Sequence, residues 1–294
     1  MSETPPVHDV AVRDITGLEQ RYPGVLDADG LRPVWLALAG CLFVVSLVAG
    51  FAALDVSWTR FFSGFSELRR LVGLMFPPEV ETMARLWMWL NALGESLAIA
   101  FLGTLAAAML AFPVSLLAAR NVMPVWLVRF TIRRGLDTVR GINTLIWALI
   151  WINVVGLGPF AGVLAIMTTD LGTFGKLFSE ALEATDHKAG EGVVASGGSP
   201  LHRIRFGLLP QVMPVLLSQI LYLMESNTRS ATIIGIVGAG GIGQHLSEAI
   251  RTLEWQQVSA LVLLILATVA AIDFVSARIR FAIIGQVSSE GTAR

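Results

Sequence analysis

The sequence predicts an all-α, polytopic membrane protein with about six transmembrane helices. Of its 294 residues, 54% are hydrophobic and only 15% are charged, and the mean hydropathy is +0.69. Soluble domains carry roughly 45–50% apolar and about 25% charged residues. Several uncharged runs are also long enough to cross a hydrocarbon core of about 30 Å as helices. Composition and run length together therefore place this chain in a lipid bilayer.

The first two spans are predicted from uncharged runs at residues 34–54 and 96–119. The polar, acidic tail of residues 1–33 lacks the basic start and early apolar core of a cleaved signal, so the first span is expected to stay in the membrane. Between the two spans, residues 55–91 are predicted to form an external loop with interfacial helices. Aromatic and leucine side chains recur there at helical spacing.

The remaining spans are predicted from three further apolar regions. Residues 141–169 are uncharged but contain GLGPF, and glycine and proline interrupt helices, so two spans at 139–157 and 160–179 are expected with a tight turn between them. A fifth span starts near Leu208, meets a polar group and resumes as SATIIGIV. The sixth covers 255–272.

Lysine and arginine in the loops predict the orientation. Basic residues concentrate at 120–140, at 188–205 and after the last span. Short loops rich in Lys and Arg remain cytoplasmic, so both termini are predicted to be cytoplasmic. The loop at 55–91 argues against this orientation, because it carries four arginines (Arg60, Arg69, Arg70 and Arg85).

Composition excludes several kinds of function. A net charge of −1 gives no indication of a nucleic-acid partner. The single cysteine, Cys41, excludes an intrachain disulfide, and no Cys/His spacing indicates zinc. We therefore expect no metal site in this chain.

The longest polar insertion between late spans, residues 180–214, predicts a helix, a turn and a second helix. Small residues occupy the first helix, Gly197 and Gly198 form the turn, and Ser199 and Pro200 supply a cap and a first helical residue. Two short helices of this kind make a projection that fits a cleft in a soluble partner.

Glu191 and Gly197, with the pair Leu209 and Pro210, follow the spacing E-A-A-x3-G-x9-I-x-L-P in this insertion. The segment resembles the cytoplasmic signature loop of ABC importer permeases. Three positions depart from the pattern: the two alanines are replaced by glycine and valine at 192 and 193, and the isoleucine by glycine at 207.

The run LLPQVMPVLLSQILYLMESNTRSATIIGIVGAGGIGQHL resembles the phosphonate importer permeases, a family that also includes importers of phosphite and hypophosphite. The resemblance rests on L-P-Q, E-x-N-x-R-S-A-T and G-x-V-G-A-G-G-I-G in this order, and it covers about residues 90–280. It implies a type I ABC importer permease fold with a permease core at 92–280. Coupling helices at about 180–207 and a cytoplasmic tail at 281–294 are also implied.

The same resemblance implies the partners. Two copies of this subunit form the pore in the inner (plasma) membrane, and a periplasmic or surface binding protein delivers the substrate. An ABC ATPase dimer binds ATP and Mg and contacts the coupling residues Glu191, Gly197, Gly198, Leu209 and Pro210. This chain has no G-x-x-x-x-G-K-[ST] loop, so no catalytic residue, cofactor or ATP hydrolysis of its own is expected.

Glu225, Asn227 and Arg229 are the candidate residues of the translocation pathway. Glu225 and Arg229 are four residues apart, so they share a helix face and can pair, while Asn227 lies on another face. A charge at bilayer depth is costly unless it is paired or faces water. Arg229 could attract an oxyanion there. The alternative is that the pair only holds the fifth span against a neighbour.

A G-x-G-x-x-G pattern at Gly238, Gly240 and Gly243 raises the rival prediction of a dinucleotide site. That site needs a βαβ unit with an acidic residue about 20 positions after the first glycine. Val258 stands there, and the preceding residues have the length of a spanning helix.

These glycines and Gly241 are instead predicted to form an external gate or a contact for the binding protein, with a plain turn between helices as the alternative. At the level of the whole chain, importers of another small solute and an ATPase-independent channel are the alternatives.

Overall fold

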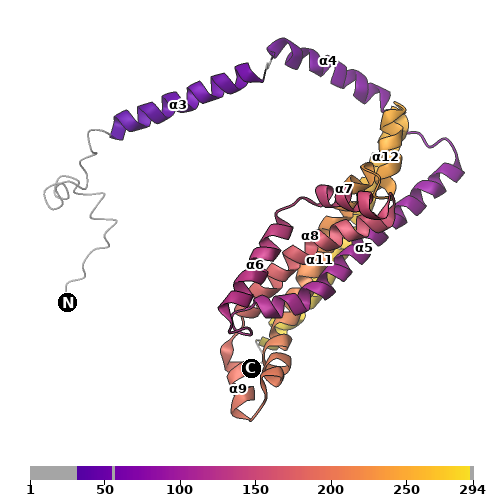
Figure 1. The fold of residues 1–294 in the computed structure, drawn as a ribbon. Coiled ribbons are helices and arrows are strands. Elements are labelled where there is room, and N and C mark those ends of the chain that lie inside the picture. Colours follow the sequence, from indigo (N-terminus) through magenta and orange to yellow (C-terminus); the bar gives the residue numbers. More distant parts are fainter. Residues whose placement is uncertain (1–31, 55–56, 292–294) are drawn as a thin grey trace, which may run out of the picture. The chain divides into compact units, whose positions relative to one another are not determined.

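The computed structural model describes residues 32–54 and 57–291, with side chains described at 34–54 and 57–280. The regular secondary structure of the described part is helical and includes no strand, which confirms the predicted all-α class (Figure 1). The chain divides into two compact units, Met1–Arg70 and Leu71–Arg294. The tails predicted at 1–33 and 281–294 lie outside the residues whose side chains are described.

The first unit contains α3 (Arg32–Ala53) and most of α4 (Trp58–Leu74). From Val34 on, α3 is apolar and about 30 Å long at 1.5 Å per residue, enough to span the hydrocarbon core. Helix α4 has no buried residue and exposes a group of packed aromatic rings, Trp58, Phe61, Phe62 and Phe65. An exposed aromatic face of this kind is typical of a helix that lies at a membrane interface.

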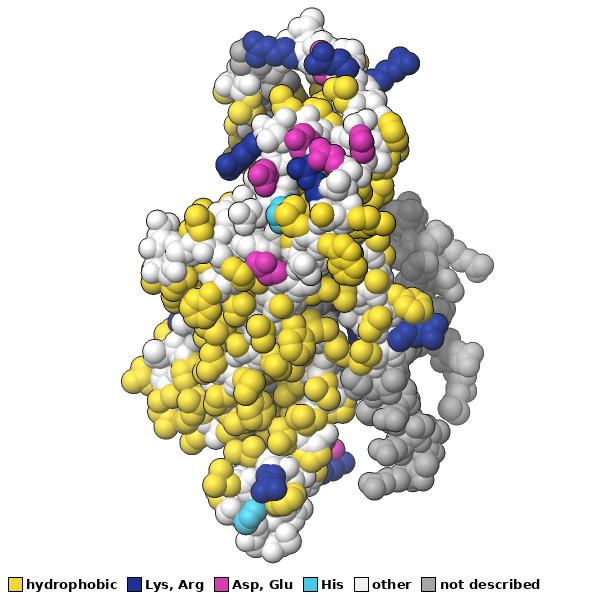
Figure 2. All heavy atoms as spheres, turned by 90° about the vertical axis from the view of Figure 1, so that its right-hand side faces the viewer, with side chains coloured by type: hydrophobic (Ala, Val, Ile, Leu, Met, Phe, Trp, Pro, Cys, Tyr) yellow, Lys and Arg dark blue, Asp and Glu magenta, His cyan; other side chains and the backbone are white. Residues whose placement is uncertain are grey.

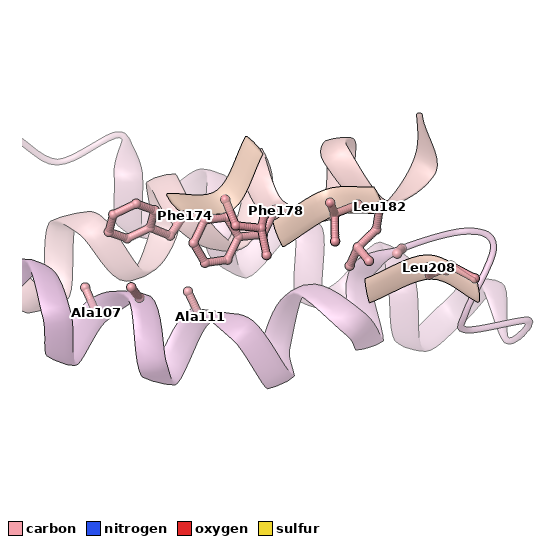
Figure 3. Close-up of a cluster of buried hydrophobic side chains, with 10 residues drawn as sticks. Ala107, Ala111, Phe174, Phe178, Leu182 and Leu208 are labelled. Carbon is pink, nitrogen blue, oxygen red and sulfur yellow. The ribbon is translucent and has the colours of Figure 1, made fainter. Parts of the chain in front are cut away.

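Four long helices form the framework of the second unit: α5 (Met83–Ala118), α8 (Pro159–Glu183), α11 (Leu209–Ile236) and α13 (Trp255–Gly291). Helix α5 begins within the segment predicted as external loop. Helix α8 contacts α5, α11, α6 (Trp126–Arg140) and α7 (Thr144–Val155). Ala107 and Ala111 on α5 face Phe174 and Phe178 on α8 (Figure 3). Small residues on one helix admit large rings from the next, so the backbones pack closely.

Four helices in the described residues are long and apolar enough to cross a membrane, at 34–53, 83–118, 200–236 and 255–280, and a fifth crossing results if the bent pair α6 and α7 counts as one. Helix α8, the predicted fourth span, does not meet that criterion of length and composition. It carries Asp170 and Lys176, whose polar groups have partners within the protein. A helix enclosed by neighbours faces little lipid and does not need the apolar composition of an exposed span.

The third predicted span, a single helix at 139–157, is wrong. Helices α6 and α7 meet there at 88°, and α7 has 12 residues, which cover only about 18 Å. Asn143 explains the break, because its side chain accepts a hydrogen bond from the N–H of Leu145 and so begins a new helix. The turn predicted at GLGPF is confirmed, since α7 ends at Val155 and α8 begins at Pro159.

The two ends of the second unit carry different short helices (Figure 1). At one end lie α9 (His187–Ala195), α10 (Pro200–His202) and the π-helix η1 (Arg203–Leu208), which leads directly into α11. At the opposite end lies α12 (Ile242–Arg251). The break predicted at the glycines after the fifth span is confirmed, because α11 ends before them and α12 begins among them.

Candidate functional site

The loop between α8 and α11 folds as two short helices joined by a glycine turn, as predicted. Asp186 caps α9 by accepting from the N–H of Lys188 at 3.0 Å. Gly197 turns the chain with a φ of +86°. Ser199 then caps α10 in a reciprocal capping box with His202, and Pro200 is the first helical residue. Local capping therefore shapes the two helices and the turn of this projection.

Contacts with α11 hold the projection in place. A Cβ added at Gly207 would lie 2.8 Å from Cα of Gly190, so η1 and α9 touch through their backbones. This close approach explains why a glycine stands at 207, where the family pattern has isoleucine. Gln211 on α11 bonds both backbone groups of Asp186, donating to its carbonyl at 3.3 Å and accepting from its N–H at 3.1 Å.

Gln211 also donates to the carbonyl of Gly207 at 2.7 Å. It is part of L-P-Q, but sequence reasoning gave it no role. The surface that this projection exposes mixes Glu191 with large apolar side chains, namely Val194, Leu201 and Phe206. Leu209 and Pro210 are the first two residues of α11 and lie beside Gln211 in the chain.

A network of four charged side chains links α11 and α13. Arg229 lies 3.7 Å from Glu225 and 3.3 Å from Asp273. Arg280 donates from Nη2 to Oε2 of Glu225 at 2.8 Å, and its guanidinium also lies over the ring of Tyr222. The expected pairing of Glu225 with Arg229 is therefore present, with two further partners from α13.

Asn227 points away from this network into the core. It is buried and donates from Nδ2 to Oγ1 of Thr104 at 2.8 Å and to the carboxylate of Asp170. Thr104 lies near the middle of α5, so we infer that Glu225 and Arg229, on either side of Asn227, lie at the depth of the hydrocarbon. Hydrophobic side chains cover most of the middle of the face in Figure 2, and charged and histidine side chains reappear at the lower end.

The glycine segment forms a tight loop that neighbouring elements clamp. The N–H of Gly241 donates to Oε1 of Glu95 at 3.0 Å, and the N–H of Ile242 donates to Oγ of Ser96 at 2.9 Å. Gly238 accepts from the N–H of Gly158 at 3.0 Å. The donors at the start of α12, which a dinucleotide phosphate would need, are thus bonded to α5, and a helix precedes them in place of a strand. The dinucleotide alternative is excluded.

The loop backbone requires glycine. Gly238, Gly240 and Gly241 have φ values of +101°, +84° and +75°, which side-chain-bearing residues rarely adopt. A Cβ on Gly243 would collide with the carbonyl of Thr232. An open concavity of about 850 Å³ lies beside the loop, lined among others by Leu157, Gly238, Gln244, Ser247 and Arg251.

A second ionic cluster lies at the α9 end of the bundle, outside the span predicted at 160–179. Glu183 accepts hydrogen bonds from the N–H and guanidinium of Arg120 and from the guanidinium of Arg133. Burial acts to raise the pKa of Glu183, but these bonds and the charge of Arg133 outweigh it, and the pKa lies below its ordinary value. This carboxylate joins α8 to α6 and to the chain that follows α5.

The sequence is similar to known transporter subunits. Residues 111–285 match the family described as binding-protein-dependent transport system inner membrane component. HtxC of Stutzerimonas stutzeri, whose name assigns it to a phosphite transport system, is 39% identical over 84% of this chain and 86% of its own length. The phosphite transport system permease protein PtxC of the same species is 34% identical over 83% of this chain and 88% of its own length.

One relative is named for a different anion. The phosphate-import permease protein PhnE of Mycolicibacterium smegmatis is 35% identical over 83% of this chain and 45% of its own length. Among solved structures, a chain of the MetNI methionine ABC transporter in inward-facing conformations superposes with a TM-score of 0.60 at 22% identity. It covers 69% of this chain and 99% of its own length.

The superposition shows that the fold is that of a type I ABC importer permease, and the apolar helices make this a multi-pass membrane protein. The family match begins in the last third of α5 and extends through most of α13. It includes the glycine loop and the projection formed by α9, α10 and η1, which we call the α9 projection. The chain therefore belongs to the family of binding-protein-dependent transport system inner membrane components, the permease subunits of ABC importers.

Proposed function

We propose that this chain is the permease subunit of an ATP-driven importer of phosphite, phosphonate or hypophosphite across the inner membrane. Two copies would form the pathway, a partner ATPase dimer would bind and hydrolyse ATP with Mg, and a binding protein would deliver the anion from outside. The observation that carries this proposal is the charged network on α11 and α13. The names of the two S. stutzeri relatives support the substrate class.

The network supports a pathway because its exposed members cannot face lipid at low cost. The side chains of Arg229 and Asp273 are 46% and 42% exposed on the surface of one copy, at the depth of the hydrocarbon. Charged groups at that depth face water or protein. A water-filled pathway between two copies satisfies this requirement, and a guanidinium there offers an oxyanion two parallel donors.

We assign different roles to the three candidate pathway residues. Arg229 faces the pathway, and Glu225 balances its charge while tying α11 to α13 through Arg280. Glu225 thus has two roles: it balances the charge of Arg229, and it holds the fifth span against a neighbouring helix. Asn227 is buried between α5, α8 and α11, and we propose that it serves packing in place of substrate contact.

The α9 projection is the proposed coupling site for the ATPase, with Glu191, Gly197, Gly198, Leu209 and Pro210 as its residues. Exposed apolar side chains on a polar loop are expected where a partner covers them. With this assignment the α9 end is cytoplasmic, and we propose that both termini are cytoplasmic as well.

The opposite end carries the proposed external gate at Gly238, Gly240, Gly241 and Gly243. Three of these glycines are buried within one copy of the chain, namely Gly240, Gly241 and Gly243. Buried residues are not accessible to a binding protein, so we assign the gate to them and not the binding-protein contact. The adjacent concavity, which includes exposed Gln244, is the proposed contact for the binding protein.

A second candidate substrate is phosphate, which the name of the M. smegmatis relative favours. An ATPase-independent channel is the other alternative. Copurification of an ATPase with this chain would separate an importer from a channel, because a channel needs no such partner.

Growth on different phosphorus sources tests the proposal. A strain that lacks this gene is supplied with phosphite, methylphosphonate, hypophosphite or phosphate as the sole phosphorus source, with wild-type and Arg229→Ala chains as complements. We expect loss of growth on at least one of the first three and its rescue by wild type alone. A deficit only on phosphate would support the second candidate. Growth on all four sources without the gene, in a strain with no other importer for them, would refute both.

A further inference from the structure

Two residues of α13, Asp273 and Arg280, complete the charged network that Glu225 and Arg229 begin. Sequence spacing gave no reason to join them, because they lie 44 and 55 residues from their partners on α11. The order along the network is Arg280, Glu225, Arg229 and Asp273, with alternating charge. Two positive and two negative groups balance, so the network has no net charge when all four are ionised.

The two ends of the network are held differently. The Arg280 end is the tighter one, since its bond to Glu225 is 2.8 Å and the carboxylate side chain of Glu225 is only 17% exposed. Tyr222 covers the guanidinium of Arg280 on one side. The Arg229 end is looser, because Arg229 approaches Glu225 only to 3.7 Å and meets Asp273 at 3.3 and 3.4 Å on the exposed surface.

We propose that Asp273 and Arg280 set the affinity of the pathway for a tetrahedral phosphorus oxyanion. Asp273 occupies the guanidinium of Arg229 between transport events and gives way when an anion takes its place. Arg280 neutralises Glu225, so that the carboxylate beside the site does not repel the incoming anion. This inference rests on the proposed pathway role of Arg229 and adds the residues that tune it.

The chemistry of a permeation site requires such tuning. A planar guanidinium binds phosphorus oxyanions through two parallel hydrogen bonds, which are strong where water is scarce. An anion must nevertheless leave the site for transport to continue. A carboxylate that competes for the same guanidinium weakens anion binding without removing the donor, and Asp273 has the position for that competition.

Charge accounting predicts opposite effects for the two residues. Asp273→Asn removes the competitor and leaves one net positive charge, so the anion should bind more tightly and leave more slowly. Arg280→Gln leaves Glu225 unneutralised beside Arg229, so the anion should bind more weakly. The double variant Asp273→Asn with Arg280→Gln is neutral again, and its affinity should return toward that of wild type.

Direct binding to the purified importer complex without its binding protein tests this inference. Phosphite and methylphosphonate are titrated against the complex in detergent, and the Kd is obtained from ³¹P NMR line broadening. We expect Kd to fall about tenfold in Asp273→Asn and to rise about tenfold in Arg280→Gln, as one unit charge about 4 Å from the anion implies at an effective dielectric constant of roughly 60 in a water-filled pathway. Arg280→Lys, which keeps the charge, should stay near wild type. Thermal unfolding of each variant shows that it is folded.

The outcomes separate this inference from the proposed function. If Arg229→Ala abolishes binding but the Asp273 and Arg280 variants leave Kd unchanged, α13 only supports α11 and the inference is overturned. Parallel weakening in Asp273→Asn and Arg280→Gln would overturn it as well, because loss of structure moves Kd in one direction. If Arg229→Ala binds and transports like wild type, the pathway assignment itself fails.

Discussion

Asn227 is the residue whose hydrogen bonds join three helices. Its amide donates to Thr104 on α5 and to Asp170 on α8. All three side chains are buried, with exposed fractions of 6%, 1% and 4%. A buried carboxylate or hydroxyl that loses its partner within a bilayer has no water to replace it.

Asn227→Ala should therefore destabilise the folded chain by about 1–2 kcal/mol. The measurement is unfolding of the purified chain in mixed micelles as denaturing detergent is increased. Thr228→Ala is the matched control, because Thr228 is also buried on α11 but its hydroxyl bonds only Met224 within the same helix. Equal destabilisation by the two substitutions would contradict the interhelical role of Asn227.

Glu183 makes stability depend on pH. Its pKa lies below the ordinary value in the folded chain, so folding favours the ionised form. The stabilisation is fully present above the ordinary pKa of a glutamate and is lost as the pH falls through the lowered folded value. At neutral pH, Glu183→Gln should lower stability by about 1–3 kcal/mol, because it leaves Arg133 without its carboxylate.

Thermal unfolding of wild type and Glu183→Gln in detergent, from pH 7 down through the acid range, measures this effect. The difference between them should be largest at pH 7 and shrink as the pH falls below the ordinary pKa. Glu180→Gln, on the same helix, serves as the control. If the difference in stability between the two proteins stays constant with pH, Glu183 stabilises the fold through packing and not through its charge.

At this scale, the sequence predicted local contacts and missed distant ones. The pairing of Glu225 with Arg229 follows from a spacing of four residues on a helix, and the structure contains it. The bonds of Asp273, Arg280 and Asn227 join residues that lie 44 to 123 positions apart. Which helices are neighbours decides those bonds, and one sequence does not contain that information.

At the scale of elements, the short helices were predicted better than the spans. Ser199, Pro200 and Gly197 act through their own backbone and caps, so their signals are local. The bend between α6 and α7 was missed because Gly141 and Asn143 stand in a run without charge, where hydropathy alone indicates one continuous span. The capping preference of Asn143 was the available signal.

The α9 projection should transmit ATP hydrolysis to α11. The chain runs from α10 through the π-helix η1 into α11 without a break. Gln211 of α11 also bonds Asp186, the residue that caps the start of α9. Gly197→Asp places a side chain at a φ of +86° on the exposed turn, and Glu191→Ala removes a charge from the exposed face of α9. Neither residue packs in the membrane, so both variants should insert normally.

We expect both variants to lose uptake while the ATPase either dissociates or hydrolyses ATP without transport. The measurements are membrane content, phosphite uptake and ATP hydrolysis in the same vesicles. Gly192→Ala is the control for the fold, because a Cβ there meets no atom within 4 Å of the chain itself. Wild-type uptake by Glu191→Ala and Gly197→Asp would remove the coupling role from this loop.

At the scale of the molecule, the distribution of charge along the second unit argues for its orientation. The α9 end and the chain leading into it carry several basic residues, among them Arg120, Arg129, Lys188, Arg203 and Arg205. Between residues 237 and 255, the segment around α12, Arg251 is the only lysine or arginine. Because basic residues are retained in the cytoplasm, this asymmetry predicts that α9 lies inside and α12 outside.

Labelling of single cysteines with a membrane-impermeant maleimide checks this orientation. Cys41→Ser gives a background without thiols, since the chain has no other cysteine. In that background, Thr252→Cys after α12 should react in intact spheroplasts, whereas Val194→Cys on α9 should react only after the membrane is opened. Both positions are exposed in the chain, so a difference reports the side of the membrane. The reverse pattern would put the glycine loop inside and would contradict the gate and the coupling site together, because the two lie at opposite ends of one unit.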